Sequence, residues 1–202
     1  MGVALEERET IAVQTPSRNM CGRAIAMTLA NPIKPGRSRI LRLNFWLTRR
    51  FPPLLWRLRK LSFIHFLRWT IVSEFPFNGP PQVPEDLAHE YLFFVSNYNG
   101  YWMQYIDAFY NVVPDQMDWI WGNTYGYPKG EPAGATKRLI HKLEFTASHY
   151  YSAYPEASAS MVQAALELRH RFAHFDAEVR DADPDRFHAR FRSFVSDVQT
   201  LL

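Results

Sequence analysis

The spacing of apolar residues changes several times along the chain, and each change predicts a new element. Residues 24–29 form a short apolar run that ends at two prolines and a glycine, a pattern typical of a strand followed by a turn. Residues 63–72 and 90–98 are rich in aromatic and β-branched side chains, and the proline-rich stretch 75–84 separates them. We therefore expect two more strands joined by a long hairpin-like loop.

Two segments, residues 37–61 and 101–113, show the spacing of three and four that predicts an amphipathic helix. Pro52 and Pro53 break the first of them, because proline has no backbone N–H and its ring obstructs a helical backbone. We expect one face of this broken helix to pack on the core and the basic residues to lie opposite. That apolar face comprises Ile40, Leu43, Leu47, Leu54, Leu55, Leu58 and Leu61.

Residues 143–151 predict a fourth strand, and two helices follow it. Ser158 or Ser160 can cap the first of these helices, and Asp183 followed by Pro184 opens the last one. The predicted domains are a flexible N-terminal arm over residues 1–21, a folded domain over 22–180 and an amphipathic C-terminal helix over 181–202.

The predicted order from residue 24 to residue 151 is strand, helix, strand, strand, helix, strand. This is the order of the ferredoxin-like βαββαβ fold, an α+β architecture with helices on one face of an antiparallel sheet. Strands 63–72 and 90–98 are apolar on both faces, so the second face needs a cover: another sheet, a partner subunit or the chain's own tail. Sheets of this type commonly pair face to face. We therefore expect a homodimer, with a pocket between sheet and helices.

Charge is distributed unevenly along the chain. No Asp or Glu occurs in the 64 residues from Thr10 to Ser73, which hold 12 of the 23 Lys and Arg residues. The remaining 11 basic residues face 20 acidic ones, so a net charge of +3 divides into +12 and −9. Such a surface can attract anionic lipid or an acidic partner, or pair with the chain's own acidic half.

Residues 37–60 combine these charges with tryptophan, as a helix lying in a membrane interface does. A solvated basic face on an ordinary core helix has the same pattern. The residues expected to carry membrane or partner docking are Arg49, Arg50, Trp56, Arg57 and Arg59.

A resemblance to known proteins lies in a series of short segments: Asn31–Gly36, His65–Trp69, Leu92–Gly100, Tyr105–Phe109 and Ser152–Pro155. Together they resemble a group of uncharacterised bacterial proteins similar to the dimeric α+β barrel superfamily, which includes dye-decolourising peroxidases, chlorite dismutases and small monooxygenases. The resemblance implies a paired ferredoxin-like domain whose pocket holds haem or an aromatic substrate. Such peroxidases carry a Gly-x-x-Asp-Gly signature, and Asn99, in the similar segment here, cannot ionise. This departure argues against peroxide cleavage.

His65 and Arg68 are the first candidate pocket residues, and strand alternation places them on opposite faces unless a bulge intervenes. His65, among apolar neighbours, could act as a neutral base or an axial ligand, or be a core histidine bonded to the backbone. Arg68 in an apolar strand needs a counter-charge, which Asp107 or Glu144 could supply. Alternatively, Arg68 could bind the carboxylate of a substrate.

His149 and Tyr151, at the end of the predicted fourth strand, are further candidate pocket liners. His170 and His174 have the i, i+4 spacing of metal ligands, but arginines flank His170 and no accompanying carboxylate completes a motif, so we expect solvent exposure and no metal. The single cysteine, Cys21, has no histidine close in sequence and is not expected to be a nucleophile. Phosphate-binding glycine loops, hydrolase elbows and zinc-finger spacings are absent from the sequence.

Two hypotheses follow for function, and neither decides whether the protein is an enzyme. In the first, a pocket with His65, Arg68, His149 and Tyr151 binds haem or a small hydrophobic molecule. In the second, a non-catalytic protein docks on an anionic membrane or an acidic partner through residues 37–60. No nucleic-acid partner is expected. The sequence shows no signal peptide or spanning segment, which favours the cytoplasm or the inner face of the membrane.

Overall fold

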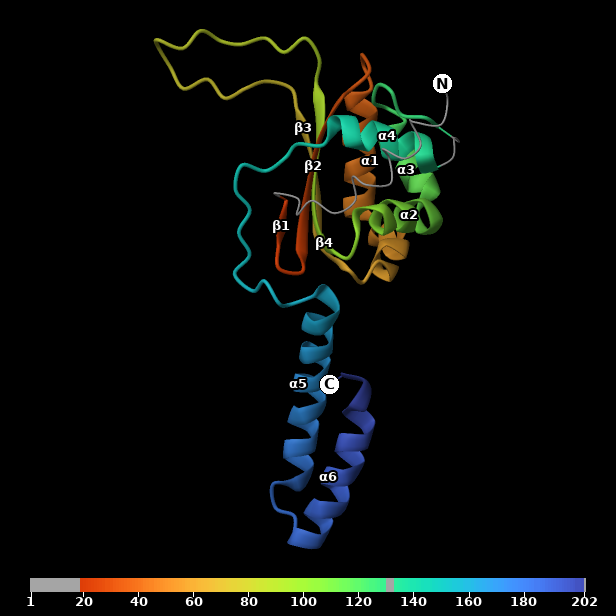
Figure 1. Ribbon diagram of the computed structural model, residues 1–202, viewed down its shortest axis with the longest axis vertical. Helices are drawn as coiled ribbons and strands as arrows, with labels where there is room; N and C mark the ends of the chain where they lie inside the picture. Colours follow the sequence, from red (N-terminus) through yellow and green to blue (C-terminus); the bar gives the residue numbers. More distant parts are fainter. Residues whose placement is uncertain (1–18, 130–132, 202) are drawn as a thin grey trace, which may run out of the picture. The chain divides into compact units, whose positions relative to one another are not determined.

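The computed structural model describes residues 19–129 and 133–201, which form two compact units divided between Pro155 and Glu156. The first, here called the sheet unit, contains every strand of the described chain (Figure 1). The second is a helical hairpin. The division comes earlier than the boundary we expected at residues 180 and 181, so the long helix after residue 158 belongs with the C-terminal helix.

The sheet unit is α+β, with a four-stranded antiparallel sheet in the order β1-β2-β4-β3. The predicted strands at 24–29, 63–72 and 90–98 are confirmed. The strands are β1 (Met20–Cys21), β2 (Ala24–Pro32), β3 (Ile64–Val72) and β4 (Tyr91–Asn99). Residues 1–18 of the predicted arm lie outside the described residues, whereas residues 19–21 belong to the sheet edge and not to an arm.

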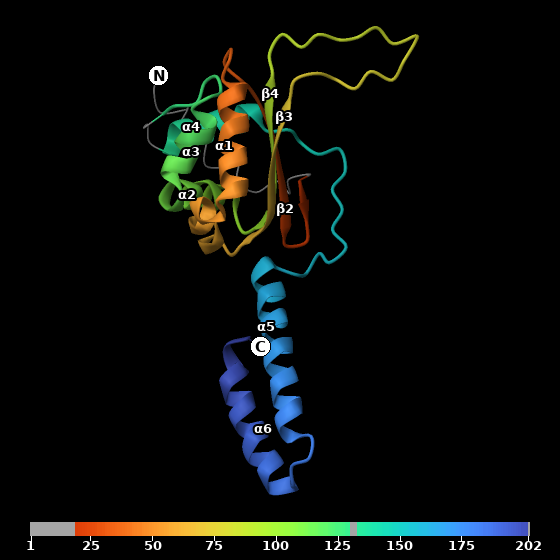
Figure 2. The ribbon, with the colours of Figure 1, turned by 180° about the vertical axis from the view of Figure 1, so that it is seen from behind.

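The helices of the sheet unit lie on one side of the sheet in both views (Figures 1 and 2). The broken helix over 37–61 and the helix over 101–113 are confirmed, with the break at Pro52 as predicted. The bounds are α1 (Ser38–Arg50), the 3-10 helix η1 (Pro52–Lys60), α2 (Trp102–Val112), α3 (Pro114–Trp121) and α4 (Ala133–Leu143). The sequence pattern missed α3 and α4.

The predicted strand over 143–151 is wrong. Helix α4 continues to Leu143, and Glu144 forms only an isolated bridge with Leu29, where the N–H of Phe145 donates to the carbonyl of Thr28 at 2.8 Å. The chain then leaves the ladder, because the side chain of Asn19 takes the next position. Its Oδ1 accepts from the Ala147 N–H at 2.6 Å and its Nδ2 donates to the Phe145 carbonyl at 3.3 Å.

The core between sheet and helices is aromatic and closely packed. Trp69 of β3 contacts the rings of Phe45, Phe94 and Trp121, and Tyr98 stacks on Tyr105 with ring centroids 3.8 Å apart. Leu41 of α1 and Leu92 of β4 are fully buried beside them. Burying such side chains supplies about 1.5–3 kcal/mol each, so this layer holds the helices on the sheet.

The second face of the sheet is covered in part by the chain itself. Phe145 stacks on Phe93 with centroids 6.1 Å apart, and the Asn97 side chain donates to the Tyr150 hydroxyl at 2.7 Å. Of the covers we considered for this face, the chain's own later segment is the one present here. Phe66 on β3 remains 52% exposed.

The helical hairpin consists of α5 (Ala159–Val179) and α6 (Pro184–Val198), followed by the 3-10 turn η2 (Gln199–Leu201). Both predicted caps are confirmed: Ser158 Oγ accepts from the Met161 N–H at 3.1 Å, and Asp183 Oδ1 accepts from the Arg186 N–H at 3.0 Å. Phe175 packs against a cluster of aromatic rings from both helices.

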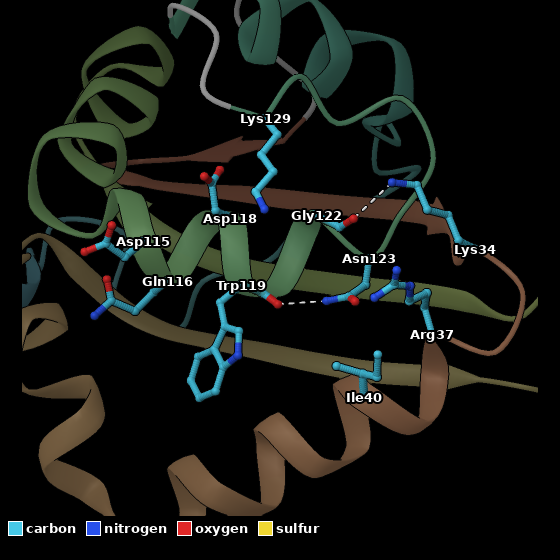
Figure 3. A pocket seen from close by; sticks show the side chains of 10 residues that line it. All are labelled: Lys34, Arg37, Ile40, Asp115, Gln116, Asp118, Trp119, Gly122, Asn123 and Lys129. Atoms are coloured by element: carbon cyan, nitrogen blue, oxygen red, sulfur yellow. Dashed lines mark hydrogen bonds between the residues drawn. The ribbon is translucent and has the colours of Figure 1, made fainter.

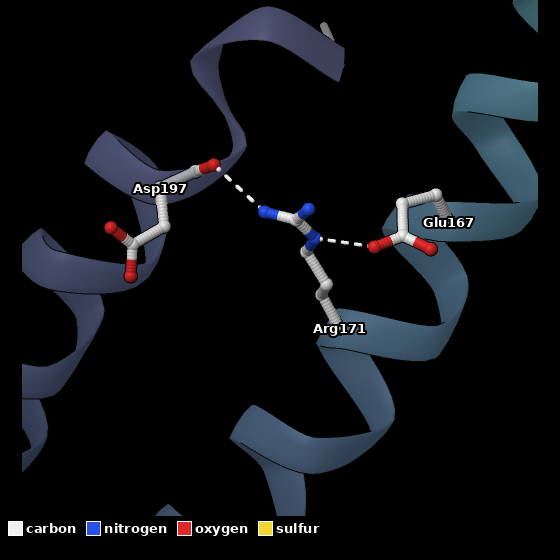
Figure 4. A network of polar contacts seen from close by, with 3 residues as sticks. All are labelled: Glu167, Arg171 and Asp197. Carbon is white, nitrogen blue, oxygen red and sulfur yellow. Dashed lines mark hydrogen bonds and ion pairs between the residues drawn. The ribbon is translucent and has the colours of Figure 1, made fainter.

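One polar contact also joins the two helices of the hairpin. The guanidinium of Arg171 donates to Glu167 on its own helix at 2.7 Å and to the Asp197 carbonyl of α6 at 3.1 Å (Figure 4).

The Asn19 contacts generate the first testable prediction. Asn19→Ala leaves the half-buried Ala147 N–H without its side-chain acceptor, and an unpaired donor costs about 1–3 kcal/mol where it is fully buried, so the lower end of that range applies here. We expect the free energy of unfolding of the sheet unit to fall by about that amount in urea titrations, with faster hydrogen exchange at Ala147. Asn111→Ala, at an exposed position on α2, is the matched control. Unchanged stability and exchange in Asn19→Ala would show that the segment after α4 is held by other contacts.

Candidate functional site

His65 and Arg68 both lie exposed on β3, and neither faces the core. The register of β3 against β4 shifts between Ile64 and Phe66, so His65 is the extra residue of a bulge and leaves the alternation that would have buried it. After the bulge, side chains alternate regularly between the two faces of the strand. Leu67 and Trp69 therefore face the core, and Arg68 faces the other side.

The expected counter-charges of Arg68 are bonded elsewhere, and that pairing prediction is wrong. Asp107 forms an ion pair with Lys137, with 2.6 Å between Oδ1 and Nζ. Glu144 accepts from the indole N–H of Trp102 at 3.1 Å. An exposed guanidinium is solvated by water and needs no buried partner, which is why the argument from burial fails here.

His149 and Tyr151 are also exposed, Tyr151 by 73%, and they lie on the irregular segment after α4 and not at the end of a strand. Between them, Tyr150 is the residue that contacts the sheet, through Asn97. Burial raises the pKa of Tyr150, and the nearby Cys21 raises it further by a smaller amount. His170 and His174 are exposed on α5, as expected.

The space between sheet and helices, where we predicted a pocket, is filled by side chains. The cavity there measures about 20 Å³ and is lined by core residues such as Met27, Phe94 and Trp121. Ligand pockets usually measure roughly 300–1,000 Å³, so haem or another hydrophobic ligand would need this core to open. Burial also raises the pKa of Tyr105, so its phenol resists ionisation more than an exposed one does. Haem binding stays a prediction.

The most unusual surface of the sheet unit lies on α1 and η1. The core-facing residues of α1 are Ser38, Leu41 and Asn44, so the helix is rotated from the predicted face, and Ile40 and Leu43 are exposed. Leu58 and Leu61 do pack inward as predicted. The side chains of Leu54 and Leu55 lie outside the described part of the structure.

This rotation exposes apolar and basic side chains together. Arg39, Leu43, Trp46 and Arg50 follow one another at spacings of four, three and four, so they form one stripe opposite the buried face. The basic-aromatic patch comprises this stripe, the exposed arginines beside it on α1, and the exposed aromatic and basic side chains of Phe51 and η1: Arg39, Arg42, Leu43, Trp46, Arg49, Arg50, Phe51, Trp56, Arg57, Arg59 and Lys60.

Four large apolar side chains of the patch are half exposed or more: Leu43 by 54%, Trp46 by 58%, Phe51 by 50% and Trp56 by 53%. Two of these rings contact cations of the patch itself. The guanidinium of Arg50 lies 5.6 Å from the Phe51 centroid, and Lys60 Nζ lies 5.0 Å from that of Trp56.

The cations of the patch have little internal neutralisation. Of the seven cations of the patch, only Arg42 lies within 4.0 Å of a carboxylate in the described part of the chain, at 3.8 Å from Glu90. We considered the alternative that this charge pairs with the chain's own acidic half. Within the described part of the chain, that single contact is the only such pairing of the patch.

A pocket of about 670 Å³ opens beside the first turn of α1 (Figure 3). It is lined by Lys34, Arg37, Ile40, Asp115, Gln116, Asp118, Trp119, Gly122, Asn123 and Lys129. Sequence reasoning did not find it, because α3 and the loop after it bring seven of these ten residues to α1. The two prolines and glycine that close the first strand were the available signal, since they hold Lys34 in a turn.

Hydrogen bonds to backbone carbonyls build this pocket. The Lys34 N–H donates to the Asn123 carbonyl at 3.0 Å, and Lys34 Nζ donates to the Gly122 carbonyl at 3.0 Å. The carbonyl of Trp119 accepts from Asn44 of α1 at 3.1 Å and from Asn123 at 2.8 Å. These bonds fix the start of α1 against the end of α3.

Comparisons with family models, curated proteins and solved structures returned no match. The resemblance to the dimeric α+β barrel superfamily thus stays a prediction. Among the described helices, none is long and apolar enough to cross a membrane. In the same part of the chain, no group of three or more His, Cys, Asp or Glu side chains is placed to hold a metal ion.

The buried carboxyl of Glu144 is expected to make the stability of the sheet unit depend on pH. Burial raises its pKa, although hydrogen bonds from Trp102 and Asn19 oppose the shift. The folded state therefore binds the proton more tightly than the unfolded state, so stability falls as pH rises from the ordinary glutamate pKa through the raised value. Glu144→Gln removes the carboxyl that titrates. In urea titrations from about pH 4 to about pH 7, the variant should lose less stability with rising pH than the native protein.

Glu85→Gln, at an exposed position of the same unit, is the control and should follow the native profile. If the Glu144→Gln profile also ran parallel to the native one, the carboxyl would not be desolvated in solution.

Proposed function

We propose that this protein is a non-catalytic peripheral protein that docks on an anionic membrane surface through the basic-aromatic patch. The observation that carries the proposal is the exposure of Leu43, Trp46, Phe51 and Trp56 among seven Arg and Lys side chains. In the sequence, the 64-residue stretch around the patch contains no Asp or Glu.

Lipid suits this surface better than an acidic protein does. An interfacial helix buries its apolar face roughly 5–10 Å into the boundary between headgroups and acyl chains, so one shallow insertion serves both the cations and the apolar side chains. Each Arg or Lys near an anionic leaflet contributes about 1 kcal/mol, and tryptophan prefers the headgroup level. An acidic protein would satisfy the charges but would leave the four large apolar side chains without a specific role.

The arrangement of the sheet unit is compatible with a ferredoxin-like scaffold for this surface. The elements β2, α1, β3, β4 and α2 follow the first five of the βαββαβ order, and β4 lies between β2 and β3 as that fold requires. The predicted sixth element is absent, so we keep the ferredoxin-like fold as a proposal. Homodimerisation through the partly covered second face is likewise a proposal.

Vesicle flotation tests the proposal directly. The protein should float with phosphatidylcholine vesicles that contain phosphatidylglycerol and stay unbound with phosphatidylcholine alone. Raising the salt to about 0.5 M should weaken binding, because the Debye length falls to a few ångströms. Failure to float with the anionic vesicles at low salt would overturn membrane docking and favour the acidic-partner alternative.

Charge reversal tests the role of the patch. The triple variant Arg50→Glu, Arg57→Glu, Arg59→Glu should lose flotation, with an affinity loss of at least about a hundredfold if each cation contributes about 1 kcal/mol. The matched control reverses three exposed cations of the same unit outside the patch, as Arg23→Glu, Arg138→Glu, Lys142→Glu. Equal losses in both triple variants would mean that net charge, and not the patch, drives binding.

The tryptophans test insertion separately from charge. Trp46→Ala with Trp56→Ala should weaken flotation about tenfold or more and leave its relative salt dependence intact, because it removes apolar insertion and keeps every cation. Tyr101→Ala with Tyr154→Ala removes two aromatic rings that are more exposed still and should leave flotation unchanged. Native affinity in the tryptophan variant would reduce the patch to a purely electrostatic surface.

A further inference from the structure

We infer that the pocket at the start of α1 binds a phosphate monoester whose body carries hydroxyl or amino groups. Three cations from three separate parts of the chain line it: Lys34 after β2, Arg37 at the cap of α1, and Lys129 in the loop before α4 (Figure 3). The pocket, of about 670 Å³, falls in the range of small-molecule sites.

The positive charge in this pocket is not neutralised by ion pairs. No carboxylate in the described part of the chain lies within 4.0 Å of the nitrogens of Lys34, Arg37 or Lys129 that could form a salt bridge. The contact from Lys34 Nζ to the Gly122 carbonyl orients the ammonium and leaves it two further N–H donors. A dianionic phosphate matches three cations better than a single carboxylate does.

The backbone adds to the same potential. Helix α1 begins at the pocket, its cap residue Arg37 makes no side-chain capping bond, and its first turn contains no acidic residue. The first N–H groups of a helix have no intrahelical acceptor, and the helix dipole makes this end positive. An anion held by the three cations therefore also gains from the start of a 13-residue helix.

The other side of the pocket selects the body of the ligand. Asp115 and Asp118 of α3 line the pocket on the side away from Lys34, and Asp118 lies beside Lys129 in Figure 3. Trp119 lies between these aspartates and Ile40 in the same view. Asp118 Oδ1 accepts from the Tyr127 hydroxyl at 2.9 Å, and its remaining lone pairs can accept from a ligand. These carboxylates would repel a second phosphate but can accept from hydroxyl or ammonium groups, while Trp119 offers an apolar surface.

Two sources could present this chemistry, a soluble phosphate monoester or the headgroup of a lipid such as lysophosphatidic acid, which keeps a free glycerol hydroxyl beside its phosphate. Ile40 lines the pocket and lies three residues before Leu43 of the patch, so pocket and patch adjoin along α1. The inference does not depend on membrane docking, because the pocket can bind a soluble monoester without it.

Calorimetry with sn-glycerol 3-phosphate and with inorganic phosphate tests the soluble source. Flotation compares phosphatidylcholine vesicles containing lysophosphatidic acid with vesicles of equal surface charge made with phosphatidylglycerol. Binding of glycerol phosphate more tightly than inorganic phosphate supports a soluble ligand. A preference for lysophosphatidic acid at equal charge supports a headgroup. If the protein neither binds a soluble monoester nor distinguishes the two lipids, the inference is overturned.

The variant Arg37→Gln with Lys129→Gln removes two exposed cations of the pocket and should weaken either form of binding about tenfold or more. Its control is Arg138→Gln with Lys142→Gln, which removes two exposed cations of α4 and should bind as the native chain does. Lys34→Gln is a second, independent variant with the same expectation.

The charge-reversed patch variant separates this inference from the proposed function. If membrane docking fails while glycerol phosphate still binds, the pocket stands alone. If docking holds but the monoester does not bind and neither lipid is preferred, only the pocket inference fails.

Discussion

Leu41 and Asn44 fix the rotation of α1 about its own axis, and both surfaces discussed above depend on that rotation. Leu41 is fully buried in the core, and the Asn44 side chain donates to the Trp119 carbonyl at the end of α3. A buried amide without a partner costs about 1–3 kcal/mol, so the helix cannot turn away from α3 without penalty. Leu43 and Trp46 must then face outward, and Arg37 must stand beside the loop that contains Lys129.

The buried polar residues of α1 explain why so much apolar surface remains exposed. Ser38 and Asn44 occupy core-facing positions where larger apolar side chains would add more burial. The core therefore does not need the leucine and tryptophan of the opposite stripe. Neighbouring exposed apolar side chains that are rimmed by polar ones commonly mark an interaction surface. Because the cations around it lack carboxylate partners within the described chain, apart from Arg42, the patch is both apolar and strongly positive.

The edge of β2 shows the same use of a polar side chain in place of regular structure. Asn19 bonds to Phe145 and Ala147, so that β1 and the segment after α4 share an edge that one longer strand would otherwise fill. The segment thus freed from the ladder packs Phe145 and Tyr150 on the second face of the sheet. In this way the chain covers part of its own apolar surface.

The sequence by itself determined the elements whose signals are local. Short apolar runs rich in aromatic and β-branched residues predicted β2, β3 and β4, the paired prolines predicted the break after α1, and the caps at Ser158 and Asp183 predicted the starts of α5 and α6. It also determined the excess of cations over residues 37–60. Only the tertiary structure decided the bulge that exposes His65, the rotation of α1, the use of residues 143–151 as a cover and the meeting of Lys34, Arg37 and Lys129. These features depend on hydrogen bonds between residues far apart in the chain, such as Asn44 with Trp119 and Asn19 with Ala147, and apolar spacing carries no record of such partners.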